Sequence, residues 1–214
     1  FQYVETDVHA TADGVLVAFH DNQLDRVTDR VGKISELSWS DVQKALVDGR
    51  EPIPRFAELM QSFPNLKVNI DPKSNSAVQP LIRELKQLQA LERVCVGAFS
   101  DSRLRKFHEE FGQEICLSMG PIAVAVARFS SWGFPKTSFR ARAAQVPIRQ
   151  GPMPIVDKRF ISRMHSLGIA VHVCTIDEVD EMNWLLDLGV DGIMTDMPAT
   201  LLDVFKQRDL WPKG

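Results

Sequence analysis

Short apolar runs rich in β-branched residues alternate with helix-patterned stretches along almost the whole chain. Each run is followed by a stretch in which apolar residues recur every three or four positions, as they do along one face of a helix. This alternation predicts a parallel sheet with helices on its faces, because parallel neighbours need a crossover connection. Seven strands are predicted, over residues 3–9, 66–70, 94–99, 115–119, 143–147, 169–175 and 190–195.

Polar residues gather at the carboxyl ends of the predicted strands. Glu5 and Asp7 lie at the end of the first strand, and Asp71 and Lys73 follow the second. Active sites of (β/α)₈ barrels lie on this rim, and no GxGxxG motif follows a strand to indicate a dinucleotide-binding sheet. We therefore expect an α/β chain with the TIM (β/α)₈ barrel fold, as a single domain over residues 1–214.

Two features modify the expected barrel. Such barrels run to about 250 residues, so a chain of 214 residues is short by about one β/α unit, which we expect to be the first. Residues 22–51 are polar and rich in turns, and we expect them to form a small insertion after the opening hairpin. Within this insertion, Ser38 with Asp41 three residues later predicts a capped helix that extends to Leu46.

The first strand is predicted to continue into a hairpin. Asp13-Gly14 is a favoured two-residue hairpin turn, because glycine adopts positive φ at little cost. With that turn, Asp7 pairs with His20 across the hairpin, and their side chains lie on the same face. Glu5 shares this face because it lies two residues before Asp7 on the strand.

Three carboxylates, those of Glu5, Asp7 and Asp71, meet on one rim if the first two parallel strands are neighbours. Like charges so close together are unfavourable unless one group is protonated or a cation joins them. Oxygen ligands favour a hard divalent ion, Mg²⁺ or Ca²⁺, over zinc. The residues therefore predict a metal site, and the alternative is three separate surface acids.

Two side chains beside this site are candidates for chemistry. His20 is a candidate catalytic acid or base, because an imidazole exchanges protons near neutral pH; the alternative is a structural histidine. Lys73 shares the face of Asp71 and is a candidate to bind a phosphoryl oxygen as a point charge. The alternative for Lys73 is a solvated lysine on the rim.

Four other residues carry weaker signals. His9 shares the face of Asp7 and either supports the site or is exposed. His172 lies in the middle of a predicted strand and could point into the barrel. Trp132 and Phe134 could flank an apolar group of a substrate, with ordinary packing as the alternative.

The composition narrows the class of protein. A net charge of −3 argues against a nucleic-acid-binding domain, which is usually basic. The three cysteines show no CxxC pattern, so we expect thiols in a reducing compartment, the cytoplasm. No apolar run approaches the roughly 18 residues of a membrane span, so no transmembrane segment is expected. The sequence does not indicate an oligomeric state.

The chain resembles glycerophosphodiester phosphodiesterases in segments spread along nearly its whole length. The matching segments, in the order of the family, are ETDVHATADG at 5–14, VAFHD followed by LDRVTDRVG at 17–32, IPRFAELM at 53–60, NIDPK at 69–73, GAFSD at 97–101, VHVCT at 171–175 and GVDGIMTDMP at 189–198. The first and the last are the most specific. The resemblance implies a TIM barrel with an insertion at about residues 22–51.

The resemblance also implies which residues act. A divalent metal would be held at the positions of Glu5, Asp7 and Asp71. The family more often has Glu at the third position, and Asp stands there in related sphingomyelinase D-like enzymes. His20 would be one of two catalytic histidines, and Lys73 matches the family's lysine.

The sequence departs from the family pattern at two places. The HRG motif, which carries the family's other histidine on the first barrel strand, is absent from the chain. Cys174 stands where the family usually has tryptophan. The smaller cysteine side chain offers less apolar surface than an indole for recognition of the glycerol group.

The implied reaction is metal-dependent hydrolysis of glycerophosphodiesters, such as glycerophosphocholine, to glycerol 3-phosphate and an alcohol, a step of glycerol and lipid metabolism. One alternative is phospholipase D-type cleavage of a lysophospholipid or sphingomyelin, which Asp71 and the aromatic stretch near Trp132 favour. The other is a non-catalytic barrel that binds phosphodiesters, which the missing HRG motif suggests.

Overall fold

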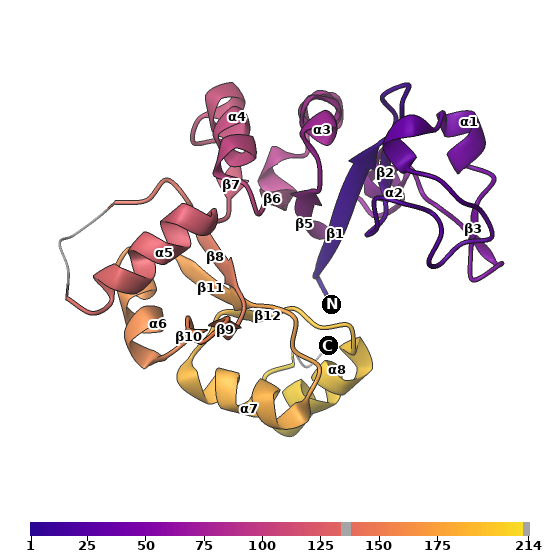
Figure 1. Cartoon of the computed structure of the whole chain (residues 1–214). Helices are drawn as coiled ribbons and strands as arrows, with labels where there is room; N and C mark the ends of the chain where they lie inside the picture. Colours follow the sequence, from indigo (N-terminus) through magenta and orange to yellow (C-terminus); the bar gives the residue numbers. More distant parts are fainter. Residues whose placement is uncertain (134–137, 212–214) are drawn as a thin grey trace. The chain divides into compact units, whose positions relative to one another are not determined.

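The structure is a computed structural model that describes residues 1–133 and 138–211. Phe134, one of the residues considered for substrate contact, lies outside the described residues. The chain divides into an N-terminal unit, Phe1–Leu117, and a C-terminal unit, Ser118–Gly214. Figure 1 shows that each unit has its own sheet and its own helices.

Parallel pairing builds the main sheet of the N-terminal unit. Its strands lie in the order β2-β1-β5-β6-β7, and all neighbours are parallel except β2, which folds back antiparallel onto β1. The strands are β1 (Tyr3–Ala10), β2 (Leu16–Ala18), β5 (Lys67–Pro72), β6 (Val94–Val96) and β7 (Cys116–Leu117). Successive residues of β5 point to opposite faces, so Val68 and Ile70 enter the core while Asp71 lies on the other face.

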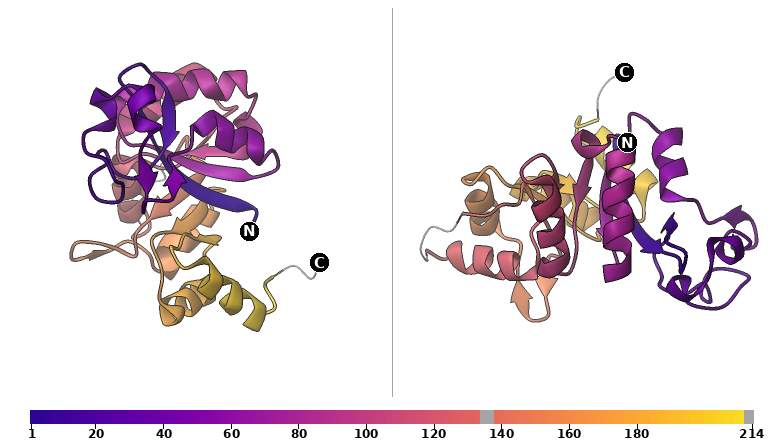
Figure 2. Two further views of the ribbon diagram at one scale, coloured as in Figure 1. Left: turned by 90° about the vertical axis from the view of Figure 1, so that its right-hand side faces the viewer. Right: turned by 90° about the horizontal axis from the view of Figure 1, so that it is seen from above.

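Three helices pack against this sheet around one hydrophobic core. They are α2 (Phe56–Ser62), α3 (Asn75–Gln87) and α4 (Asp101–Phe111). Helices α3 and α4 lie side by side (Figure 1, Figure 2). Leu81 and Leu85 of α3 are four residues apart, and both are buried together with Phe107 of α4. Burying each such side chain contributes roughly 1.5–3 kcal/mol, so the core holds the carboxyl ends of the strands in place.

The C-terminal unit repeats the same arrangement. Its sheet has the order β12-β11-β8, and both pairs are parallel. The strands are β8 (Ala143–Val146), β11 (Ala170–Val173) and β12 (Gly192–Ile193), and a small hairpin of β9 (Arg149–Gln150) and β10 (Met153–Pro154) follows β8. The helices are α5 (Pro121–Ser130), α6 (Lys158–His165), α7 (Val179–Leu188) and α8 (Pro198–Gln207).

The seven parallel strands expected from the sequence are all present within the described residues. Four belong to the N-terminal sheet and three to the C-terminal sheet, and a helix follows each of them. The expected alternation is therefore confirmed. No helix in the described part of the chain is long and apolar enough to cross a lipid bilayer.

Residues 22–51 form a small lobe with a hydrophobic core of its own. Its elements are the 3₁₀ helix η1 (Ile34–Glu36), α1 (Trp39–Val42), β3 (Leu46–Val47) and β4 (Glu51–Pro52). The buried residues of this lobe are Val17, Leu24, Ile34, Val42, Ala45 and Ile53. Since Val17 and Ile53 flank the segment, the lobe is anchored to the opening hairpin and to the start of α2.

The predicted helix of the insertion is wrong in its length and its cap. Helix α1 ends at Val42, and Leu46 belongs to a strand. The Ser38 hydroxyl donates to Oδ2 of Asp41 at 2.8 Å and does not cap the helix. The amide of Leu46 donates to Oδ1 of Asp29 at 2.8 Å, a contact from a distant loop that local sequence patterns do not encode.

The register of the opening hairpin also differs from the prediction. Thr11 donates from its amide to the carbonyl of Val15, and Gly14 lies at φ 79°, so the loop contains three residues instead of two. The register therefore shifts by one residue, and the amide of Phe19, not His20, faces the carbonyl of Asp7. Because β2 ends before His20, the imidazole still reaches the Asp7 side of the sheet.

Glu84 on α3 is an acid whose environment disfavours its charge. Its Oε2 atom is buried and has no hydrogen-bond partner among the described residues. Burial raises the pKa of Glu84 to about 7, although Arg55, Arg83 and the amide of Leu16 partly offset the effect. A folded-state pKa above the unfolded value favours the fold at low pH, and this contribution is lost as the pH rises through about 7.

Glu84→Gln is expected to raise the free energy of unfolding by about 1–3 kcal/mol at pH 8, because it removes a charge that is unfavourable to bury. The gain is limited because the site is partly exposed and water screens the charge. At pH 4 the change should be small. Denaturant unfolding at both pH values measures this, with Glu109→Gln, at an exposed position of α4, as the matched control. An equal gain at pH 4 and pH 8 would contradict the assignment.

Candidate functional site

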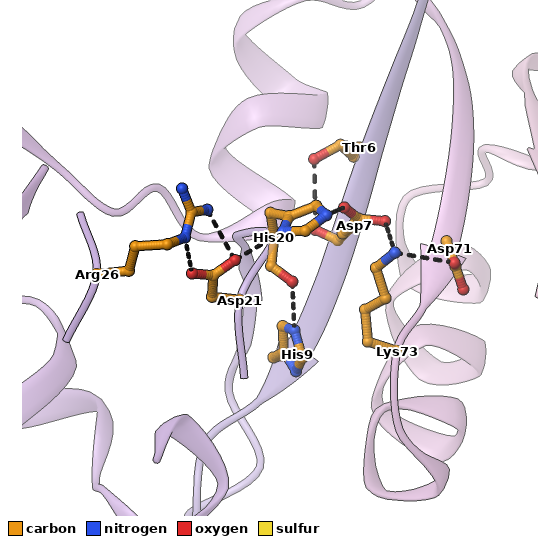
Figure 3. A network of polar contacts seen from close by, with 8 residues as sticks. All are labelled: Thr6, Asp7, His9, His20, Asp21, Arg26, Asp71 and Lys73. Atoms are coloured by element: carbon orange, nitrogen blue, oxygen red, sulfur yellow. Dashed lines mark hydrogen bonds and ion pairs between the residues drawn. The ribbon is translucent and has the colours of Figure 1, made fainter. Parts of the chain in front are cut away.

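Adjacent positions on β1 and β5 bring two carboxylates together. Asp7 and Asp71 are partners in the parallel register, so their backbones are about 4.8 Å apart. Asp71 lies near the carboxyl end of β5 and Asp7 beyond the middle of β1, and both side chains face the same lysine (Figure 3). The expectation that these two strands are neighbours is confirmed.

Lys73 lies between the two aspartates. Its Nζ atom is 2.8 Å from Oδ1 of Asp7 and 3.2 Å from Oδ2 of Asp71. Its amide donates to the carbonyl of Val8, which keeps the residue in line with β1 just beyond the end of β5. Burial works against the ammonium charge, but the two aspartates outweigh it and raise the pKa of Lys73. Lys73 is therefore held by ion pairs between the two aspartates, and its role in binding a phosphoryl oxygen stays a prediction.

The carboxylates of this cluster repel one another. Burial is the main cause that raises the pKa of Asp71, and the charge of Asp7 adds to it. Loss of hydration and the charge of Asp7 also raise the pKa of Glu5. Glu5 is exposed as a residue, however, so water screens part of this effect. The site thus favours any cation that reaches it.

His20 extends from the bend after β2 towards Asp7. Its Nε2 atom is 3.8 Å from Oδ2 of Asp7, and Nδ1 donates to Oδ1 of Asp21 at 2.7 Å (Figure 3). Arg26 donates to both oxygens of Asp21, at 2.6 and 2.9 Å. Because the carboxylate of Asp21 accepts the Nδ1 proton, the neutral ring carries its lone pair on Nε2.

His9 supports the backbone of His20. The imidazole is 6% exposed, and its Nε2 donates to the carbonyl of His20 at 3.1 Å. Burial is the main cause that lowers the pKa of His9, which keeps it neutral as such a donor. Of the two readings of His9 that the sequence left open, the structure selects the buried, supporting one.

The donor set suits a hard divalent ion in its chemistry. Oδ1 of Asp71 is buried without a hydrogen-bond partner among the described residues, and Oδ1 of Asp7 meets Lys73 only as an ion pair. Carboxylate oxygens left in this way are open to a cation. Within the described residues, however, no three His, Cys, Asp or Glu side chains are grouped closely enough to hold a metal ion. Glu5 lies further back along β1.

A cavity of about 590 Å³ opens beside this cluster. His9, His20 and Lys73 line one side of it, and residues from the segment 21–35 line another. Its volume is in the usual range for small-molecule sites. The insertion therefore forms a wall of the cavity that His20 and Lys73 line, whereas Glu5, Asp7 and Asp71 are not among the residues that line it.

The sequence matches the glycerophosphoryl diester phosphodiesterase family over residues 1–200. The chain belongs to this family. A Mycobacterium tuberculosis protein named "Probable glycerophosphodiester phosphodiesterase 2" is 34% identical, over 99% of this chain and 82% of that protein. A mouse protein named lysophospholipase D is 24% identical, over 94% of this chain and 76% of that protein.

A solved structure extends the comparison to the fold. The Oleispira antarctica phosphodiesterase, in complex with the product sn-glycerol-3-phosphate, superposes with a TM-score of 0.78 at 19% identity, over 96% of this chain and 85% of that one. This family member has the TIM barrel fold, as expected from the sequence. The expectation of a phosphoric diester hydrolase is confirmed at the level of the family, while the absence of a first β/α unit stays a prediction.

Two of the weaker candidates lie in the C-terminal unit of this family member. His172 packs against Gly192, where an added Cβ would come within 2.9 Å of its Cδ2, and burial lowers the pKa of the ring. Trp132 stacks edge-on against Phe129 and lies 4.6 Å from the guanidinium of Arg128. The contacts of Trp132 are those of local helix packing.

Sequence reasoning assigned no role to Asp21 or Arg26. Both lie in segments that match the family, in the dipeptide His20-Asp21 and in the run that begins at Leu24. The signal was therefore present, but their partnership depends on how the insertion folds back. Arg26 is five residues from Asp21, a spacing that matches neither a strand nor a helix face.

Arg26→Ala is expected to raise the pKa of Asp21, because the hydrogen bonds from Arg26 are the main cause that holds it below its usual range. An NMR titration of the aspartate side-chain carbons measures the change. Arg50→Ala, at another exposed arginine of the insertion, is the control and should leave the Asp21 titration unchanged. A titration of Asp21 that ignores the loss of Arg26 would refute the pairing.

Lys73→Met is expected to lower the free energy of unfolding by about 1–3 kcal/mol at pH 8, because two half-buried carboxylates lose their cation. The loss should be smaller at pH 5, where protonation relieves the repulsion. Thermal unfolding at both pH values measures it, with the exposed Lys106→Met on α4 as the control. A loss that does not depend on pH would point to packing alone.

Proposed function

We propose that this chain hydrolyses glycerophosphodiesters to glycerol 3-phosphate and an alcohol with the help of a divalent metal ion. The observation that carries the proposal is the ion-paired cluster around Lys73, with His20 beside it, in a member of this family. The Mycobacterium relative's name and the product in the Oleispira structure support the substrate class.

Glu5, Asp7 and Asp71 are the residues we propose for the metal, Mg²⁺ or Ca²⁺. Their oxygens suit such ions, and the pKa of two of them is raised, as expected where negative charge accumulates. When bound, the ion would supply positive charge to the phosphoryl oxygens as a Lewis acid.

Lys73 has the geometry to hold a phosphoryl oxygen. An ammonium group carries three N–H donors, and two of them are directed at Asp7 and Asp71. The third N–H group can donate to a phosphoryl oxygen of a substrate in the cavity that Lys73 lines. In this role Lys73 both orders the carboxylates and orients the diester.

His20 is proposed as the residue that exchanges the proton. Its Nδ1 proton is donated to Asp21, so the neutral ring takes up a proton at Nε2, the atom that faces Asp7. Nε2 can take a proton from the attacking water and return it to the leaving alcohol, while the P–O bond to water forms and the P–O bond to the alcohol breaks. Asp21, fixed by Arg26, maintains the ring orientation that this exchange needs.

Lysophospholipid cleavage is the second candidate, because the mouse relative is named lysophospholipase D. No described residue that lines the cavity has an aliphatic side chain, which favours a water-soluble diester instead, since an acyl chain needs apolar side chains around it.

For the location, we propose the cytoplasm, supported by three cysteines without a disulfide-type spacing.

His20→Ala is expected to lower the release of glycerol 3-phosphate from glycerophosphocholine at least about 100-fold, and a chelator should abolish the wild-type activity until Mg²⁺ or Ca²⁺ is restored. Enzymatic detection of glycerol 3-phosphate measures both. His108→Ala on α4 is the matched control. Activity that persists with the chelator would contradict the proposed metal dependence. An active His20→Ala protein would contradict the proposed role of His20. Turnover of lysophosphatidylcholine alone would favour the second candidate.

A further inference from the structure

The insertion contributes a wall to the cavity beside His20 and Lys73, and this wall has a specific chemistry. Apart from the imidazoles of His9 and His20, no described residue that lines the cavity has an aromatic side chain, and none has an aliphatic one. The insertion's neutral side chains there are Asn22, Gln23 and Ser35, which we call the insertion wall. All three are exposed.

The charged groups around the insertion wall are already compensated. Arg26 is paired with Asp21 through two hydrogen bonds, and Asp25 accepts from the amide of Gly32 at 2.9 Å. Lys73 is paired with its two aspartates. The insertion wall itself makes no side-chain hydrogen bond with any part of the chain that the structure describes, so its amides and hydroxyl keep their full bonding capacity.

This chemistry distinguishes between the alcohols that a phosphodiester can carry. A quaternary ammonium such as choline is recognised by aromatic faces, and an acyl chain by apolar surface. Side-chain amides and hydroxyls each donate and accept, which suits a ligand with several neutral hydroxyl groups. A site that binds hydroxyl groups strongly rejects analogues that lack them.

We propose that the insertion wall binds a neutral polyol as the leaving alcohol of the diester, such as glycerol or inositol. The inference rests on the proposed phosphodiesterase activity and adds the substrate class to it. His20 and Lys73 line the same cavity, so a diester whose phosphoryl group meets Lys73 extends its alcohol along the insertion wall. The insertion thus selects the substrate as well as supporting Arg26.

The test compares kcat/KM of the metal-loaded protein for glycerophosphoglycerol and for glycerophosphocholine. Wild type is expected to favour glycerophosphoglycerol by about 10-fold or more. The double variant Asn22→Ala, Gln23→Ala should lose most of this preference through a higher KM, with less than about a two-fold change for glycerophosphocholine. The control, Gln61→Ala with Asn65→Ala, removes the same residue types from exposed positions outside the cavity.

The outcomes separate the two proposals. A preference for choline in the wild type, or an equal loss on both substrates in the double variant, would overturn the polyol assignment. If neither diester is hydrolysed, the proposed function fails, and calorimetric titration of wild type with both diesters still tests the insertion wall. Tighter binding of glycerophosphoglycerol would then support it, and equal binding would overturn it. Ser35→Ala gives an independent variant if the double variant does not fold.

Discussion

The parallel register of β1 against β5 places Asp7 beside Asp71, and the candidate site is built around the resulting repulsion. Two unit charges 4 Å apart interact with about 4 kcal/mol at an effective dielectric constant of 20. The ammonium of Lys73 offsets this within the chain itself. The same concentration of negative charge would attract the proposed divalent ion. One group of charges therefore serves both the fold and the proposed chemistry.

The insertion is tied to this arrangement in two ways. Its own small core, which includes Leu24 and Ile34, fixes the loop that carries Arg26, and Arg26 in turn fixes Asp21 against His20. The same loop lines the cavity beside the carboxylates. A segment without barrel strands of its own therefore bears on both the orientation of His20 and the surface that a substrate would contact.

Much of the fold could be predicted because its signals are local. The alternation of apolar runs and helical spacing identified the seven strands, and the buried Val68 and Ile70 of β5 show why the period of two was informative. The opening hairpin was placed one residue out of register, because Asp13-Gly14 also fits a three-residue loop with Gly14 at positive φ. The helix after Ser38 was predicted too long, since a contact from Asp29 claims the amide of Leu46.

The sequence by itself determined the β/α alternation, the family, and the residue types at the strand ends, because these depend on spacing along the chain. Only the tertiary structure decided which groups meet: Lys73 between two aspartates, Arg26 on Asp21, and His20 reaching Asp7 through a bend. Apart from Asp71 and Lys73, whose spacing of two fits a strand, these contacts join residues whose separations match no regular period. They form because packed strands and the insertion's own core bring distant positions together, which no local pattern specifies.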